Sequence, residues 1–144
     1  MKLQLNKVEM LKVLHSAFCN GGLNELRYCD VELNVLEKEY VNARNRLEKQ
    51  ILKGNNENVY YVGTDGPTVC LEDVYLEILR EGEAINFIDH NNGKKIGFTL
   101  SKAIKSLSRE EFASDVLKTV KGGDDAWTGF NLIQGCLYGE VVYG

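Results

Sequence analysis

The chain has 144 residues, 44% of them hydrophobic, and its 17 basic and 21 acidic side chains give a formal net charge of −4. A chain of this length needs only one hydrophobic core, and an acidic protein repels the phosphate backbone of nucleic acids. No apolar run approaches the roughly 20 residues that span a bilayer. We therefore expect one α+β domain over residues 1–144, located in the cytoplasm, with neither a membrane span nor a nucleic-acid partner.

The first predicted helix begins after Asn6. Asn6 and Glu9 have the spacing of a capping box, and apolar residues then recur at helical intervals until the Asn-Gly-Gly sequence at 20–22. The segment 23–33 suits either a short strand or an irregular approach to the next helix, and we favour the strand.

The clearest helical pattern runs from residue 34 to residue 53. Asn34 and Glu37 repeat the capping spacing, and the Gly-Asn-Asn sequence at 54–56 ends the pattern. One face of this helix is predicted to be apolar, with Leu36, Tyr40, Ala43, Leu47 and Ile51.

A strand, a turn and a helix are predicted next. The β-branched and aromatic run 59–62 favours a strand, and 64–67, which contains the only proline, favours a turn. Apolar spacing over 71–80 predicts a helix, with Gly82 at its C′ position.

Residues 84–100 predict a β-hairpin. Alternating runs at 84–89 and 96–100 flank the sequence Asn91-Asn92-Gly93-Lys94. An Asn-Gly pair between alternating runs is a strong hairpin signal, because both residues tolerate positive φ.

Two short helices are predicted after the hairpin. Ser101 is placed to cap a helix that reaches Leu107, and Ser108 with Glu111 has capping-box spacing before a second helix, which the glycines at 122–123 end.

A last helix is predicted to begin at Asp124 or Asp125 and to end at Gly139. Its inward side chains are expected to be Trp127, Phe130, Ile133, Leu137 and Cys136. The residues after it stay apolar and aromatic to the end of the sequence, so we expect them to be held in place as a short strand against the sheet. The predicted fold is thus four to five helices packed on a small, mainly antiparallel sheet that contains the Asn-Gly hairpin.

The cysteines do not predict a metal site. There is no C-x-x-C pair, and only His15 and His90 are present to complement thiolate ligands. We expect buried free thiols at Cys19, Cys29, Cys70 and Cys136.

Neither histidine has a recognisable catalytic context. No serine or cysteine nucleophile is tied to His15 by a local motif, so a structural helix histidine is favoured. Asp89 precedes His90, but adjacent strand residues point to opposite faces, which favours polar turn chemistry. No catalytic residue is predicted, although a hydrolase using His15 or His90 stays open.

Two glycine-containing loops are candidates for anions or cations. The loop 63–68 lacks the lysine of a P-loop and also lacks G-x-G-x-x-G, so a plain turn is favoured. Asp124 and Asp125 follow two glycines, but a helix N-cap explains them better than a divalent cation does. No cofactor is predicted.

A final stretch of sequence carries a family resemblance. The segments Glu83–Asp89, Phe98–Ser101 and Leu132–Gly144 resemble a family of small uncharacterised proteins of phages and mobile elements of gut anaerobes. The likeness covers roughly the C-terminal half, from the 71–80 helix onward. It implies a genomic context, and a host-cell cytoplasmic location if the chain is phage-encoded, but it brings no established activity and no catalytic residues.

We therefore expect a non-enzymatic accessory protein that binds a host protein and inhibits a defence or regulatory factor. Its aromatic residues, such as Tyr60 and Tyr61, would supply the interface. The alternative is a protein that sequesters a small molecule or nucleotide, with anion contacts from the 63–68 turn and a homo-oligomer left open. The basic residues considered for those contacts are Lys94, Lys95, Lys102 and Lys105.

Overall fold

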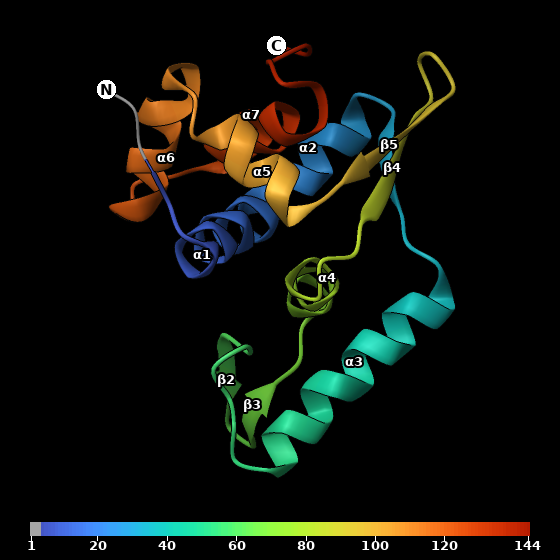
Figure 1. Ribbon diagram of the computed structural model, residues 1–144, viewed down its shortest axis with the longest axis vertical. Coiled ribbons are helices and arrows are strands. Elements are labelled where there is room, and N and C mark those ends of the chain that lie inside the picture. The colour runs from blue at the N-terminus through green and yellow to red at the C-terminus, as the bar shows by residue number, and fades with distance from the viewer. Residues whose placement is uncertain (1–3) are drawn as a thin grey trace.

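Helix α4 (Leu71–Arg80) lies between two groups of elements in the computed structural model, which describes residues 4–144 (Figure 1). On one side stand α3 (Glu37–Leu52) and the small hairpin of β2 (Tyr61–Gly63) and β3 (Gly66–Thr68). The other side is mainly helical, with α1 (Lys7–Ala17), α2 (Leu23–Tyr28), α5 (Leu100–Leu107), α6 (Ala113–Val120) and α7 (Ala126–Tyr138).

The larger sheet has three antiparallel strands in the order β1 (Val31–Asn34), β4 (Ile85–Asp89) and β5 (Lys94–Phe98). Phe87, in the central strand, lies opposite Leu33 on one side and Ile96 on the other. Every second residue of β4 is buried, as the alternating sequence predicts. The Asn-Gly hairpin is confirmed, and Gly93 takes a φ of +73° in its turn.

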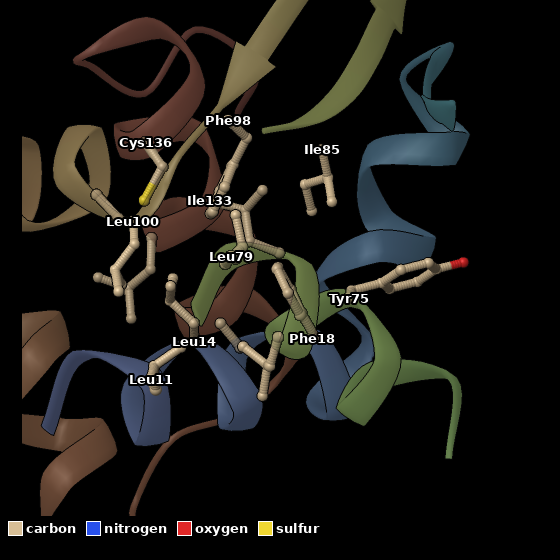
Figure 2. Close-up of a cluster of buried hydrophobic side chains, with 14 of the residues drawn as sticks. Leu11, Leu14, Phe18, Tyr75, Leu79, Ile85, Phe98, Leu100, Ile133 and Cys136 are labelled. Carbon is tan, nitrogen blue, oxygen red and sulfur yellow. The ribbon is translucent and has the colours of Figure 1, made fainter. Parts of the chain in front are cut away.

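The core forms where α4 meets the helical side (Figure 2). Apolar side chains converge there from α1, from the residue that follows it, and from α4, α5, α7 and the larger sheet: Leu11, Leu14, Phe18, Leu79, Ile85, Phe98, Leu100, Ile133 and Cys136. Fully burying one such large side chain contributes about 1.5–3 kcal/mol. Tyr75 joins the edge of this cluster and points its hydroxyl away from it, so the same ring faces both the core and the surface.

A short π-helical segment, η1 (Phe18–Gly22), kinks the chain between α1 and α2. Gly21, inside the kink, has a φ of +91°, which glycine adopts without strain. The helix end predicted at 20–22 is therefore confirmed, because the chain kinks there before α2 begins. The strand predicted over 23–33 is only half correct, because 23–28 is helical and the strand begins at Val31. A single buried residue such as Leu26 fits a helix as well as a strand, so the short apolar pattern did not separate the two.

Several predicted helix ends are confirmed. Asn6 and Glu9 form a reciprocal capping box, and Asp125 accepts the backbone N–H of Thr128 at 2.9 Å. Gly82 and Gly139 both take positive φ beyond their helices.

Other predicted caps are wrong. Helix α3 begins after Leu36 without a side-chain cap, so Asn34 is not its N-cap. Helix α5 is capped by Thr99 in place of Ser101. Ser108 donates back to the Ile104 carbonyl of the preceding turn, and a 3₁₀ turn, η2 (Glu110–Phe112), leads into α6.

The end of the chain is held in place, but not as the predicted strand. Residues 141–144 do not pair with any strand. The side chain of Gln134 forms hydrogen bonds with their backbone instead. Gln134 Oε1 accepts the N–H groups of Val142 (2.8 Å) and Tyr143 (2.7 Å), and its Nε2 donates to the Tyr143 carbonyl (3.0 Å).

Trp127, predicted to point inward, is 52% exposed.

The predicted fold class is confirmed as α+β with a small antiparallel sheet, and α2 is a helix that the sequence pattern did not predict. The strand predicted at 59–62 begins at Tyr61, and the predicted turn joins β2 to β3. None of the helices within residues 4–144 has the length and apolar character needed to cross a membrane.

Candidate functional site

Three titratable side chains meet where the end of α1 approaches the start of α4. His15 and Cys19 are four residues apart, a spacing that places both on one helix face. His15 Nε2 lies 3.4 Å from Cys19 Sγ and 3.7 Å from Asp73 Oδ1. We refer to Cys19, His15 and Asp73 as the thiol cluster.

Asp73 is the buried member of the thiol cluster, with 1% of its surface exposed. Its Oδ2 accepts the Cys70 N–H at 2.9 Å, which caps α4. Its Oδ1 has no hydrogen-bond partner of normal geometry, although the Tyr60 backbone N–H is close enough to act on the carboxyl. Burial raises the pKa of Asp73 despite the opposing effects of these N–H groups and of His15.

The electrostatics keep His15 uncharged and Cys19 protonated. Burial lowers the pKa of His15, against the opposing pull of Asp73 and Glu72. Burial, together with the negative charges of Glu72 and Asp73, raises the pKa of Cys19 to about 12. At neutral pH the cluster therefore holds a thiol beside a neutral imidazole, with no thiolate.

A hollow of about 320 Å³ opens beside Cys19, between η1, α2, β1 and the start of α4. Its charged lining is Arg27, Glu32 and Glu72, and the negative charge of Asp73 also acts on the Cys19 thiol. Tyr75 lines it as well, from the edge of the core (Figure 2). We call this the acidic hollow, because its carboxylates outnumber its one basic group.

A second hollow, of about 460 Å³, opens beside the other half of α1. Lys7, Lys12 and Arg80 line it against a single acid, Glu57, so we call it the basic hollow. Arg80 and Arg46 both form ion pairs with the buried carboxylate of Glu77. The net charge of these three side chains is therefore +1. Val8 at its rim is 63% exposed.

The His15 ring stands between the two hollows. Tyr60 lines the basic hollow and stacks on His15, with 4.2 Å between ring centroids, while Cys19 lines the acidic hollow and contacts His15 from the other side. Val8, Lys12, His15 and Cys19 follow one face of the chain at helical spacing. The basic hollow is therefore lined by α1 itself, and the acidic hollow is reached at Cys19, just beyond the end of α1 on the same face of the chain.

Sequence reasoning placed His15 correctly in a helix but missed its partners. No catalytic motif links His15 to a nucleophile in the sequence, but the structure brings Cys19 into contact with it, and the four-residue spacing was the available signal. Cys19 is also exposed, which contradicts the expectation of a buried thiol, whereas Cys136 is fully buried. Asp73 had no sequence signal beyond its capping position, because only the tertiary fold brings α4 to α1.

The other candidate residues lie elsewhere. His90 Nε2 is 3.7 Å from Glu32, and Asp89 Oδ1 accepts the Asn91 N–H in the hairpin turn, so polar turn chemistry is confirmed there. Lys102 donates to the carbonyls of Gly97 and Leu137. The 63–68 loop is a β-turn between paired strands, also as predicted.

Neither hollow is lined by the residues expected to bind anions, Lys94, Lys95, Lys102, Lys105 and the 63–68 turn. Within residues 4–144, no group of three or more His, Cys, Asp or Glu side chains is placed to hold a metal ion.

Comparison with known proteins finds one similarity of note. A shikimate dehydrogenase (NADP⁺) of Methanococcus vannielii is 29% identical over 118 residues, which cover 78% of this chain and 39% of that protein. The chain thus matches well under half the length of that relative. No protein-family profile and no solved structure matches the chain.

Proposed function

We propose that this chain is a binding domain that takes a segment of a partner protein along the exposed face of α1. The observation that carries the proposal is the pair of oppositely charged hollows on either side of the His15–Tyr60 stack. Complementary charge gives an interface its specificity and its register.

The spacing of the hollows describes the segment they fit. Lys12 on α1 and Cys19 on η1 are seven residues apart, which corresponds to about 10 Å along a helix axis. The partner segment would place an acidic group near Lys12 and a basic group near Glu32 and Glu72, with an apolar side chain over Val8. An extended chain covers such a span in about three residues.

The family resemblance of the C-terminal half supplies a context for this proposal. A small protein of phage or mobile-element type would act by occupying a host defence or regulatory factor. The similarity to a shikimate dehydrogenase offers an alternative function, that of an enzyme. The chain lacks G-x-G-x-x-G, and the strands of residues 4–144 pair only antiparallel, whereas the glycine-rich dinucleotide site is built on parallel strands. We therefore do not extend dehydrogenase activity to this chain.

A small-molecule binder is the second candidate, favoured by the volume of the acidic hollow, about 320 Å³, which is within the range of ligand pockets. The carboxylates there fit an amine or another cation, and they disfavour the nucleotide considered from the sequence. Such a ligand would bind in the acidic hollow alone and would make no contact with Lys12, which lines the basic hollow.

A charge-swap experiment tests the proposal. The double variant Lys12→Glu/Glu32→Lys keeps the net charge and reverses one group in each hollow, and Lys38→Glu on α3 is the control. Tagged proteins would be used to capture partners from a lysate of the natural host, with mass spectrometry for proteins and metabolites. We expect one stoichiometric protein on the wild type and on Lys38→Glu, and its loss from the double variant.

Two outcomes would contradict the proposal. The captured protein would stay bound to the double variant if it used another surface. A retained cationic metabolite with no protein would instead establish the second candidate, and Glu32→Lys alone would then abolish its retention while Lys12→Glu would not.

A further inference from the structure

The unpartnered oxygen of Asp73 points to chemistry at Cys19. A buried carboxylate oxygen without a hydrogen bond of normal geometry is costly, and Asp73 Oδ1 is one: it lies 3.7 Å from His15 Nε2, and the Tyr60 backbone N–H acts on the carboxyl without forming such a bond. In the His15 tautomer with its hydrogen on Nδ1, the protonated Cys19 thiol donates to Nε2 across 3.4 Å, and Nε2 then has no hydrogen to offer Asp73. A proton moved from sulfur to Nε2 would place a charged N–H donor beside Asp73 Oδ1.

We propose that Cys19 forms mixed disulfides with uncharged or cationic disulfide compounds, with His15 taking the thiol proton and Asp73 stabilising the imidazolium. His15 touches the reacting sulfur and acts as the base, and Asp73 acts through His15 as a positioning residue. This inference concerns Cys19 alone and holds with or without a partner segment on α1.

The reaction balances with the groups present. The Cys19 sulfur attacks one sulfur of the disulfide, and its proton moves to His15 Nε2. A new S–S bond forms as the old one breaks, and the electron pair leaves on the departing thiolate. The imidazolium then returns the proton to that thiolate, so that a thiol is released. Because sulfur attacks sulfur, no negatively charged oxygen forms, and the reaction needs no group to stabilise one.

The charge preference follows from the groups that face the cluster. From α4, Asp73 and Glu72 place negative charge beside Cys19, and Glu32 of β1 lines the same hollow against Arg27. On the other side, the Tyr60 ring stacks on His15, and the positive charge of Arg80 acts on the Tyr60 hydroxyl. An anionic disulfide would be repelled where the sulfur is reached, and a cationic one attracted.

The test uses three disulfides of different charge with the full-length protein. Cystamine is dicationic, 2-hydroxyethyl disulfide is neutral, and 3,3′-dithiodipropionate is dianionic. Mass spectrometry of peptides would follow the rates at Cys19 and at Cys29, a partly exposed thiol whose pKa is raised by burial and by nearby acids. We expect Cys19 to react about tenfold or more faster with cystamine than with the dianion.

The pH profile separates base catalysis from simple exposure. Because His15 is uncharged above its lowered pKa, the Cys19 rate should already be level with pH at neutrality, while the Cys29 rate keeps rising about tenfold per pH unit as its thiol ionises. His15→Gln should lower the Cys19 rate at neutral pH about a hundredfold and restore the steep rise. Ser16→Ala, one residue along α1, is the control that should change nothing.

Asp73→Asn tests the positioning role. It removes the charge that favours the imidazolium, so the acid midpoint of the Cys19 profile should move to lower pH. The inference is overturned if His15→Gln, shown by circular dichroism to be folded, leaves the Cys19 rate and its pH profile unchanged. Parallel profiles for Cys19 and Cys29, or equal rates with the cationic and anionic disulfides, would also overturn it.

Discussion

Asp89 shows how one buried carboxylate holds distant segments together. It is 1% exposed, and its Oδ2 accepts the hydroxyls of Tyr138 and Tyr143, each at 2.8 Å. Its Oδ1 accepts the N–H and the side-chain amide of Asn91 at 2.9 and 3.0 Å. The turn of the large hairpin, the end of α7 and residue 143 are therefore bonded to one side chain.

Replacing Tyr143 tests this arrangement. Tyr143→Asp removes the hydroxyl bonds and places a second carboxylate near Asp89, so we expect the free energy of unfolding to fall by about 2–3 kcal/mol. Tyr143→Phe, which loses only the hydroxyl, should cost about 1 kcal/mol. Urea denaturation measures both, and an unchanged midpoint for Tyr143→Asp would show that the end of the chain is not held in solution.

The pH dependence of stability should report on Asp89. Burial acts to raise the pKa of Asp89, but the hydrogen bonds from Tyr138, Tyr143 and Asn91 outweigh it and hold the pKa below the ordinary 3.8. Its stabilising contribution is therefore complete above that ordinary value and is lost as the pH falls through the lower folded value. Thermal melts between about pH 5 and pH 2 should show a steeper acid loss for the wild type than for Asp89→Asn.

Among the elements, α1 and α7 pack at a distance that only glycine permits. A Cβ on Gly129 would lie 2.8 Å from the Ala17 carbonyl oxygen, and one on Gly22, in η1, would lie 3.0 Å from the backbone carbonyl carbon of Gly129. Both obstacles are backbone atoms, which cannot turn aside as a side chain can. The two helices must therefore stay close for the core between them to close.

Gly129→Ala should force these helices apart. We expect a loss of about 1–3 kcal/mol in the free energy of unfolding, despite the better helix propensity of alanine. Gly97→Ala is the control, because its Cβ would meet nothing nearer than 3.8 Å and its φ needs no glycine. Equal denaturation midpoints for the two variants would contradict this close packing.

Across the whole molecule, α3 and the β2–β3 hairpin stand on one side of α4, away from α1, α5 and α7 (Figure 1). Helix α3 buries only Ala43 and Leu47, whereas α7 is buried along most of its length, from Thr128 to Leu137 apart from Asn131. The two sides therefore contribute unequally to the core.

Hydrogen exchange should reveal this inequality. Segments with few buried apolar side chains open at lower free energy than the core. We expect the amides of α3 and β2–β3 to exchange faster than those of α7 and α1, as measured by mass spectrometry of peptides at neutral pH. Uniform protection across α3 and α7 would mean that the whole domain opens only as one unit.

The sequence alone predicted most of the helices, the Asn-Gly hairpin and the fold class. These features depend on residues close together in the chain: Asn6 with Glu9 as a cap, Gly82 and Gly139 beyond helices, and alternating residues on either side of Gly93. The caps at Asn34, Ser101 and Ser108 were wrong because capping spacing is common and local geometry selects among several polar residues.

Only the tertiary structure decided the site and the position of the chain end. His15 and Cys19 are neighbours on a helix, but Asp73, 58 positions from His15 in the sequence, joins them because α4 packs beside α1. Gln134 and Asp89 bind the final residues through side chains, which leave no periodic pattern as a strand would. Periodicity records which face of an element is buried, whereas contacts between distant polar side chains depend on how the elements pack, and no local pattern records that.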